Sequence, residues 1–106
     1  MNDYVRQLLE TSESINNRTI SLVRCLILTL LGYFADGLQY RELKSALKLS
    51  DGKLASDLGQ LEAMGYIQKS TVRLERRKLT VYSLTPEGRK ETRKIAKWMD
   101  LIRKVT

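Results

Sequence analysis

The sequence LSDGKLASDLGQLEAMGYI, residues 49–67, decides the fold, because it predicts one short capped helix followed directly by a strand. Ser50 is a suitable N-cap, since its hydroxyl can accept a hydrogen bond from a free amide of the first turn. Asp51 places a negative charge at the positive end of the helix dipole. Gly65 ends the helix, which therefore spans residues 51–65.

The two faces of this helix differ in their chemistry. Apolar side chains recur at the helical period and form the buried stripe, which consists of Leu54, Leu58, Leu61 and Met64. The polar side chains expected to face outwards are Lys53, Ser56, Asp57 and Gln60. A row of small and hydrogen-bonding side chains fits the major groove of DNA. An ordinary amphipathic helix whose polar face meets water has the same pattern.

The segment before this helix predicts the first half of a helix-turn-helix. Residues 40–47 form a short helix with Leu43, Ala46 and Leu47 directed inward, and residues 48–50 turn the chain into the outward-facing helix. This order of elements favours DNA binding over a merely solvated helix.

The segment after the helix predicts a β-hairpin with a basic tip. Strands over residues 66–73 and 79–84 are joined by a charged turn at residues 74–78, and residues 38–40 alternate like a very short strand that pairs with the hairpin. The turn contains no glycine. The basic side chains of the hairpin that are expected to contact DNA are Lys69, Arg73, Arg76, Arg77 and Lys78.

Apolar periodicity predicts further helices on both sides of this unit. Residues 3–15 form an amphipathic helix after the N-cap Asn2, and residues 19–32 form a helix that is apolar almost all round, so we expect burial on most of its sides. Thr85 and Pro86 open a last helix that runs to about residue 104. The fold class is therefore mainly α with a small β-hairpin.

Three blocks of the sequence resemble winged-helix transcription regulators, in particular the small archaeal and bacterial MarR-like and ArsR-like domains. The blocks are YRELKSALKLSDGKLASDL (residues 40–58), LEAMGYI (residues 61–67) and RRKLTVYSLTPEG (residues 76–88). The resemblance covers about residues 19–95. It implies a winged helix-turn-helix with extra N- and C-terminal helices, in which the hairpin is the wing and helix 51–65 is the recognition helix.

The chain departs from this family at two places. The family more often has a Gly-Arg-Lys-Pro-like wing tip, where this chain has ERRK at residues 75–78. Family members also tend to carry histidine or basic residues on the later part of the recognition helix, where this chain has Asp57, Gly59 and Gln60. Asp57 would repel phosphate; it could accept from a cytosine amino group, or have a solvated or helix-internal role.

We expect residues 1–106 to form one domain, in which 42% of the residues are hydrophobic. It comprises an N-terminal helix (1–17), a winged-helix core (19–85) and a C-terminal dimerisation helix (86–106). Residues 1–68 carry 7 basic and 8 acidic side chains, whereas residues 69–106 carry 12 and 4, so positive charge gathers in the wing and the last helix. Such clustering is typical of nucleic-acid binders, although a solvated helix face or an acidic protein partner would also suit it.

The residue inventory argues against an enzyme. The chain has no histidine and one cysteine, so a zinc site, a Cys-His nucleophile and a Ser-His triad cannot be assembled, and we expect no cofactor and no metal. Cys25 lies in the most apolar segment, where a buried thiol is expected and redox sensing is the alternative. The N-terminus is not a signal peptide, and the longest uncharged run, residues 25–35, is too short to cross a bilayer, so a cytoplasmic protein without membrane contact is expected.

We therefore expect a sequence-specific transcription regulator that binds double-stranded DNA, with the recognition helix in the major groove and the wing on the backbone or in the minor groove. The recognition-helix residues expected to contact DNA are Ser50, Lys53, Ser56, Asp57 and Gln60. A winged-helix adaptor that binds an acidic protein is the alternative, because a fold does not dictate a function. A winged helix bound to RNA is a further possibility.

Apolar stripes on the first and last helices predict a homodimer. The expected interface residues are Val5, Leu8, Leu9, Ile15, Ile95, Trp98, Met99, Ile102 and Val105. Because the rest of the last helix is strongly charged, a coiled-coil-like seam between subunits explains the pattern better than full burial. The alternative is that the two helices pack on each other within one monomer. A dimer would favour an inverted-repeat site.

Overall fold

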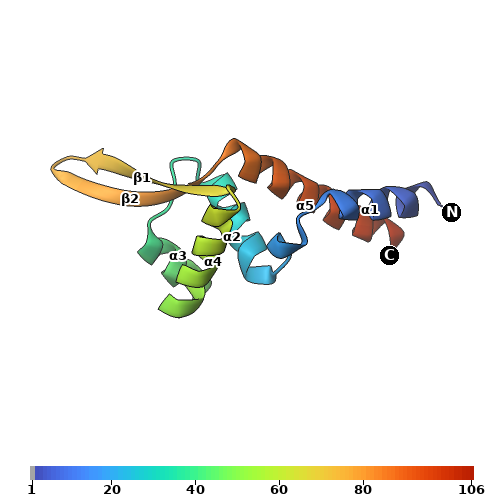
Figure 1. Cartoon of the computed structure of the whole chain (residues 1–106), viewed down its shortest axis with the longest axis horizontal. Coiled ribbons are helices and arrows are strands. Elements are labelled where there is room, and N and C mark those ends of the chain that lie inside the picture. Colours follow the sequence, from blue (N-terminus) through green and yellow to red (C-terminus); the bar gives the residue numbers. More distant parts are fainter. Residues whose placement is uncertain (1) are drawn as a thin grey trace.

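Five α-helices and one β-hairpin form residues 2–106, the part of the chain that the computed structural model describes. The elements are α1 (Asp3–Ser14), the 3-10 turn η1 (Asn17–Thr19), α2 (Leu22–Tyr33), α3 (Tyr40–Leu47), α4 (Asp51–Ala63), β1 (Ile67–Leu74), β2 (Arg77–Leu84) and α5 (Pro86–Val105). Figure 1 shows an elongated molecule, about 60 Å long, with the hairpin projecting at one end and α1 beside α5 at the other. The predicted fold class, a mainly α winged helix-turn-helix with extra terminal helices, is confirmed.

The helix-turn-helix consists of α3 and α4. Lys48 joins them in the left-handed conformation (φ 53°), and the Ser50 hydroxyl caps α4 by accepting from the Lys53 amide at 3.2 Å, as predicted. Asp51 lies 3.0 Å from Lys44 Nζ, and its carbonyl accepts from the Tyr40 hydroxyl at 3.0 Å. The hydrogen bonds from Lys44 and Tyr40 also lower the pKa of the Asp51 carboxyl. The start of α4 is therefore fixed to α3.

The core lies where α2, α3, α4, β2 and α5 meet. Its buried side chains include the predicted α4 stripe of Leu54, Leu58 and Leu61, with Ile27, Leu28 and Leu31 of α2, Leu43 of α3 and Ile95 of α5. The expectation that α2 is buried on most sides agrees with the structure except along one stripe, on which Leu22, Leu26, Thr29 and Tyr33 are exposed. The other positions of the helix are buried or half-buried, because α3, α4, β2 and α5 all contact it.

The start of α2 also differs from the prediction. The chain first forms η1, and Ser21 then caps α2 by accepting from the Arg24 amide at 3.0 Å, so the helix begins at Leu22 instead of residue 19. The α1 and α5 bounds agree closely with the predicted ones, and Asn2 and Thr85 cap these helices as expected.

The wing is a regular antiparallel hairpin whose register runs from the pair Ile67 and Leu84 to the pair Leu74 and Arg77. Its turn consists of residues 75–76 only, so the strands extend closer to the tip than predicted. Glu75 takes a positive φ of 57° at the first central position, which a glycine would adopt without strain. The short strand expected at residues 38–40 is reduced to one bridge, in which Leu38 exchanges two hydrogen bonds with Tyr82 (2.9 and 2.8 Å).

The long helix α5 leaves the hairpin through a tight junction. The Thr85 hydroxyl accepts from the Gly88 amide at 2.9 Å and donates to the Gly65 carbonyl at 2.6 Å. Gly88 lies directly on the backbone of Tyr66, because a Cβ at position 88 would be 1.9 Å from the Tyr66 carbonyl oxygen. Only glycine fits this contact.

Helices α1 and α5 lie side by side within one protomer (Figure 1). This packing within a protomer is the alternative given above to a seam between subunits. Lys94 Nζ donates to the Ser14 carbonyl at 3.2 Å, and the buried carboxylate of Glu91 accepts from the Asn16 amide at 2.8 Å. Ile95 is 4% exposed and belongs to the protomer's own core. Its assignment to a dimer interface is therefore wrong, because the side chain is buried in the core cluster of its own protomer.

Candidate nucleic-acid interface

The outward face of α4 is lined by small residues. Gly52, Ser56, Gly59 and Ala63 are exposed and follow the spacing i, i+4, i+7 and i+11, which places them on one stripe. A Cβ added at Gly52 or Gly59 would meet no atom within 4 Å. This side of α4 is therefore open, and another surface can approach the helix backbone closely.

Polar side chains lie on this stripe, at Ser56, and along one side of it. Ser50, Lys53 and Ser56 are exposed, as predicted for α4, and Gln60 is half-buried. The Ser50 oxygen is already engaged as the helix cap. Lys53 Nζ lies 2.9 Å from Asp57 Oδ2, one helical turn later.

Asp57 does not face outwards, and its prediction as a base contact is wrong. Its side chain is buried, with the residue 1% exposed, and Oδ1 accepts from Arg24 Nε at 2.9 Å. The position follows Leu54 by three residues and precedes Leu61 by four, so it falls on the buried stripe. Burial acts to raise the pKa of Asp57, but the hydrogen bonds and charges of Lys53 and Arg24 outweigh it and lower the pKa. Asp57 has the helix-internal role left open as an alternative.

The sequence patterns did not predict that Arg24 and Arg18 contact α4. Arg24 Nη1 donates to the Arg18 carbonyl at 2.6 Å while its Nε binds Asp57, so it joins η1 to α4. A signal for Arg24 existed, because it is the single charge in the apolar run of residues 19–35, and a buried charge requires a partner.

Arg18 reaches α4 directly. Its Nη2 donates to Gln60 Oε1 at 2.6 Å, and the residue is exposed. In Figure 1 the segment between α1 and α2 lies beside α4, and it also contacts α5, because the Asn16 amide donates to Glu91 Oε2 at 2.8 Å. No periodic pattern predicts the contact between Arg18 and Gln60, because the two residues are 42 positions apart in the chain.

The wing carries crowded positive charge. Arg73 pairs directly with Lys78 across the strands, and like charges at opposed positions repel each other. Within residues 2–106, no acidic side chain forms an ion pair with Arg73, Arg76, Arg77 or Lys78. Lys69 differs from them, since it lies at the base of the wing, 4.0 Å from Glu62 and over the Tyr82 ring.

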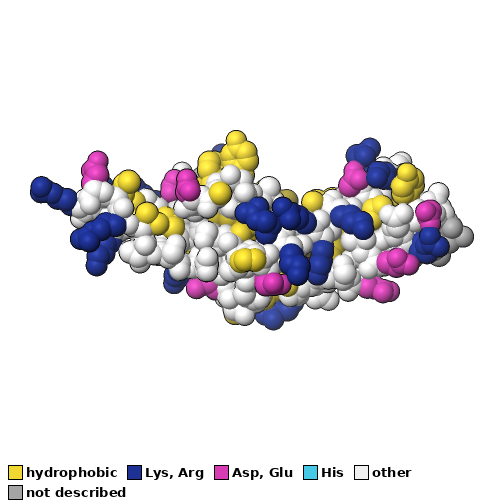
Figure 2. All heavy atoms as spheres, turned by 90° about the horizontal axis from the view of Figure 1, so that it is seen from above, with side chains coloured by type: hydrophobic (Ala, Val, Ile, Leu, Met, Phe, Trp, Pro, Cys, Tyr) yellow, Lys and Arg dark blue, Asp and Glu magenta, His cyan; other side chains and the backbone are white. Residues whose placement is uncertain are grey.

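A second group of positive charges lies on α5. Figure 2, which looks onto the α5 side, shows Lys and Arg side chains at the end of the wing and over the middle of the molecule. The exposed basic residues of α5 that form no ion pair within residues 2–106 are Arg89, Lys90, Arg93 and Lys97. Because α4 lies on the other side of the molecule, only the wing charges adjoin the helix-turn-helix (Figure 1).

The described residues were also compared with the requirements of a metal site, a membrane span and a reactive thiol. Between residues 2 and 106, no group of three or more His, Cys, Asp or Glu side chains is placed so that it could hold a metal ion. None of the helices in this range is both long and apolar enough to cross a membrane. Burial raises the pKa of the Cys25 thiol, although a backbone hydrogen bond at Ser21 opposes the shift. A raised pKa reduces the thiolate fraction, which favours the structural interpretation of Cys25 over redox sensing.

Comparisons with known proteins agree with this geometry. A family model described as a winged helix DNA-binding domain matches residues 23–102. Among solved structures, the chain is similar to the putative transcriptional regulator ytfH from Salmonella typhimurium, with 27% identity and a TM-score of 0.61 over 93% of this chain and 80% of that one. A transcriptional regulator from Clostridium thermocellum is 26% identical, with a TM-score of 0.59 over 76% and 85% of the two chains.

The MepR–DNA complex of S. aureus shares the fold at 20% identity, with a TM-score of 0.71 over 96% of this chain and 71% of that one. No curated protein matches the sequence. The family model covers most of the chain, including the helix-turn-helix, the wing and most of α5. The chain belongs to the winged helix DNA-binding domain family.

Proposed function

We propose that this protein is a sequence-specific regulator of transcription that binds double-stranded DNA as a cytoplasmic homodimer. Helix α4 enters the major groove, and the wing follows the backbone or the adjacent minor groove. The observation that carries the proposal is the open outward face of α4, bordered by Lys53 and Gln60 and adjoined by the unpaired wing cations.

The glycines of α4 support close approach to a partner. A glycine inside a helix costs roughly 0.5–1 kcal/mol relative to alanine. Packing within the protein gives no reason for Gly59, because a methyl group there would meet nothing. Close approach of the DNA bases to the helix backbone would explain a glycine at this position, since base edges are read by direct contact in the major groove.

The wing charges support binding to phosphate. Arg73 and Lys78 face each other across the strands and repel, and Arg77 and Arg76 add further charge at the tip. An anionic backbone would relieve this repulsion and release its own counterions on binding. Lys69, at the base of the wing, is the least suited of the five because Glu62 partly neutralises it.

The homodimer rests on apolar surface that one protomer leaves uncovered. Leu9 of α1 and Met99 of α5 are both 49% exposed, and Val105 is exposed near the end of α5. Val5, Leu8, Ile15, Trp98 and Ile102 are half-buried between or beside the two helices. Large apolar side chains exposed together on one part of a small domain mark an interaction site.

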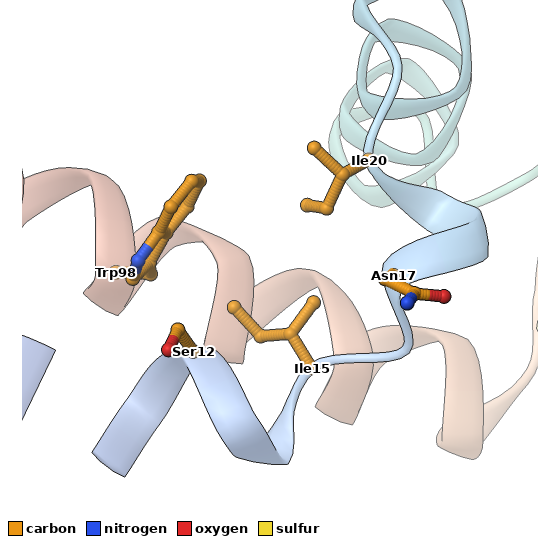
Figure 3. A pocket seen from close by; sticks show the side chains of 5 residues that line it. All are labelled: Ser12, Ile15, Asn17, Ile20 and Trp98. Atoms are coloured by element: carbon orange, nitrogen blue, oxygen red, sulfur yellow. The ribbon is translucent and has the colours of Figure 1, made fainter. Parts of the chain in front are cut away.

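A pocket adds to this surface. Figure 3 shows Ile15, Ile20 and Trp98 around an open cavity of about 340 Å³ between α1, η1 and α5, with Ser12 and Asn17 at its edges. Its mainly apolar wall suits side chains of a second copy. Two recognition helices related by a twofold axis would then read half-sites about one duplex turn apart.

Selection of bound duplexes from a random pool tests the proposal. We expect enrichment of an inverted repeat, and affinity for it that falls steeply between two salt concentrations, because phosphate contacts release counterions. Competition with structured RNA distinguishes duplex DNA from RNA as the preferred ligand. A pool without any enriched duplex would refute the proposed function.

Sedimentation tests the dimer separately. We expect the wild type to be a dimer at micromolar concentration, and the variant with both Trp98→Ala and Ile102→Ala to be a folded monomer. A monomeric wild type would refute the homodimer and leave DNA binding by a single winged helix unaffected.

The basic residues of α5 favour a second candidate function, in which the protein is an adaptor that binds an acidic protein. Arg89, Lys90, Arg93 and Lys97 are exposed on α5, a helix that lies on the other side of the molecule from α4 (Figure 1). Neutralising Arg89 and Arg93 should leave duplex binding unchanged under the DNA-binding proposal. If this change abolishes function in the cell while neutralising the wing does not, the adaptor is favoured.

A further inference from the structure

We propose that Arg18, which lies outside both the recognition helix and the wing, contacts a DNA phosphate and orients Gln60 toward the bases. The inference rests on the proposed function and adds a specificity-determining residue to it. It starts from the hydrogen bond of 2.6 Å between Arg18 Nη2 and Gln60 Oε1.

The position of Arg18 is fixed by several contacts. Its amide donates to Asn16 Oδ1 at 3.0 Å, and its carbonyl accepts from Arg24 Nη1 at 2.6 Å. Arg24 is in turn held by the buried carboxylate of Asp57 in α4. Helix α4 therefore holds the backbone of η1 through the Asp57 and Arg24 pair, and the Arg18 side chain extends from that anchored backbone.

The free donors of Arg18 suit a phosphate. A guanidinium carries five N–H donors in a planar fork, and Gln60 takes one of them. The side chain is exposed, and none of the acidic groups in residues 2–106 forms an ion pair with it. Arginine binds phosphate oxygens through two parallel hydrogen bonds, so a backbone phosphate beside the groove would occupy the remaining donors.

Arg18 also supplies a charge that α4 lacks. The later half of α4 has no basic side chain, since Asp57 is buried, Gly59 has none and Gln60 is neutral. A cation beside this half of the helix comes instead from η1. At this end of α4, a major groove bordered by phosphates would meet Arg18, which forms no ion pair, and Lys69, which Glu62 partly neutralises.

The same hydrogen bond fixes the orientation of the Gln60 amide. Arginine has no acceptor, so the Gln60 oxygen must face Arg18 and the Nε2 donors point elsewhere. Acceptors on base edges in the major groove are guanine O6 and N7, adenine N7 and thymine O4. Gln60 is therefore set to donate to one of these acceptors.

Salt-dependent binding of Arg18→Ala tests the phosphate contact. We expect its affinity for the selected duplex to fall about tenfold and the slope of log affinity against log salt to decrease by about 0.9, the value for one phosphate contact. Arg6→Ala is the matched control, because it removes the same charge from an exposed side chain that pairs only with Asp3 on α1. Arg18→Lys should restore the slope, which a merely structural role would not predict.

The isosteric variant Gln60→Glu tests the orientation. Its carboxylate would still pair with Arg18 but would offer no donor, so we expect the preferred base at one position of each half-site to change to one with an amino group, cytosine or adenine. Thermal unfolding of each variant checks that the fold is retained.

The inference is overturned if Arg18→Ala binds with the same affinity and slope as Arg6→Ala, or if Gln60→Glu keeps the wild-type base preference. In both cases the wild type still binds its selected duplex, and the proposed function stands. A wild type that binds no duplex at all refutes the proposed function itself.

Discussion

Adding one methyl group to α4 should make the protein more stable and bind DNA more weakly. Gly59 lies inside the helix Asp51–Ala63, and a Cβ there meets no atom within 4 Å. Gly59→Ala therefore gains helix propensity without a steric cost in the free protein, about 1 kcal/mol. For a domain of this size that gain corresponds to a rise in Tm of roughly 4–8 °C.

In the complex with DNA we expect the same methyl group to be unfavourable. If the bases approach the backbone of α4, the added methyl group has to be accommodated in a close-packed interface, at a cost of about 1–3 kcal/mol. We therefore expect affinity for the selected duplex to fall roughly 5- to 150-fold. Thermal unfolding and duplex titration of the same preparation measure both effects.

Gly32→Ala in α2 is the matched control. Its Cβ would lie 3.4 Å from Leu84 Cδ1, an ordinary contact within the protein and outside the open face of α4, so duplex affinity should not change. A Gly59→Ala protein that is more stable and binds as tightly as the wild type would refute the close approach of α4 to DNA. A less stable variant would refute the assignment of an open helix face.

Three further changes probe the wing and the buried charge of α4. Neutralising Arg76 and Arg77 together should weaken binding to all duplexes and reduce the salt slope by roughly one to two units, and unchanged affinity would contradict a wing contact. Glu75→Gly should raise the free energy of unfolding by about 0.5–1 kcal/mol, because glycine takes the positive φ of the turn without strain, whereas a loss of stability in urea would contradict this account. Asp57→Ala should cost about 1–3 kcal/mol at neutral pH, because it leaves Arg24 without its buried partner. Because the pKa of Asp57 is lowered in the folded protein, its contribution is complete above the ordinary value of 3.8 and is lost as the pH falls through the lower folded value. The stability difference between wild type and variant should therefore shrink in acid, and a constant difference between pH 7 and pH 3 would contradict the ion pair.

Patterns between near neighbours in the chain predicted most of the fold. The caps Asn2, Ser50 and Thr85, the α4 stripe and the hairpin were all recognisable, because each depends on residues a few positions apart. The exposed side of α2 could not be recognised, since the sequence of a helix that is apolar all round does not indicate which of its sides is covered by other elements.

The candidate site could be predicted only in part. The burial of Asp57 could have been inferred from its place on the apolar stripe, together with the lone charge of Arg24 in an apolar helix. The contact between Arg18 and Gln60 could not have been inferred from the sequence, because it depends on how η1 packs against α4 and produces no periodic pattern. Sequence patterns identified the helix that we propose reads DNA, and tertiary packing decides which of its side chains are free to do so.

The junction at Gly88 has a consequence for the spacing of a DNA site. Contact with Tyr66 and the double hydrogen bonding of Thr85 fix the direction in which α5 leaves the wing and the end of α4. A helix of 20 residues is about 30 Å long, so a change of about 10° at this junction would move its far end by about 5 Å. One base pair adds about 3.4 Å to the distance between half-sites. In a dimer joined through α1 and α5, a rigid junction would therefore fix the distance between the two α4 helices. Such a dimer would bind poorly to operators whose half-site spacing is longer or shorter by a single base pair.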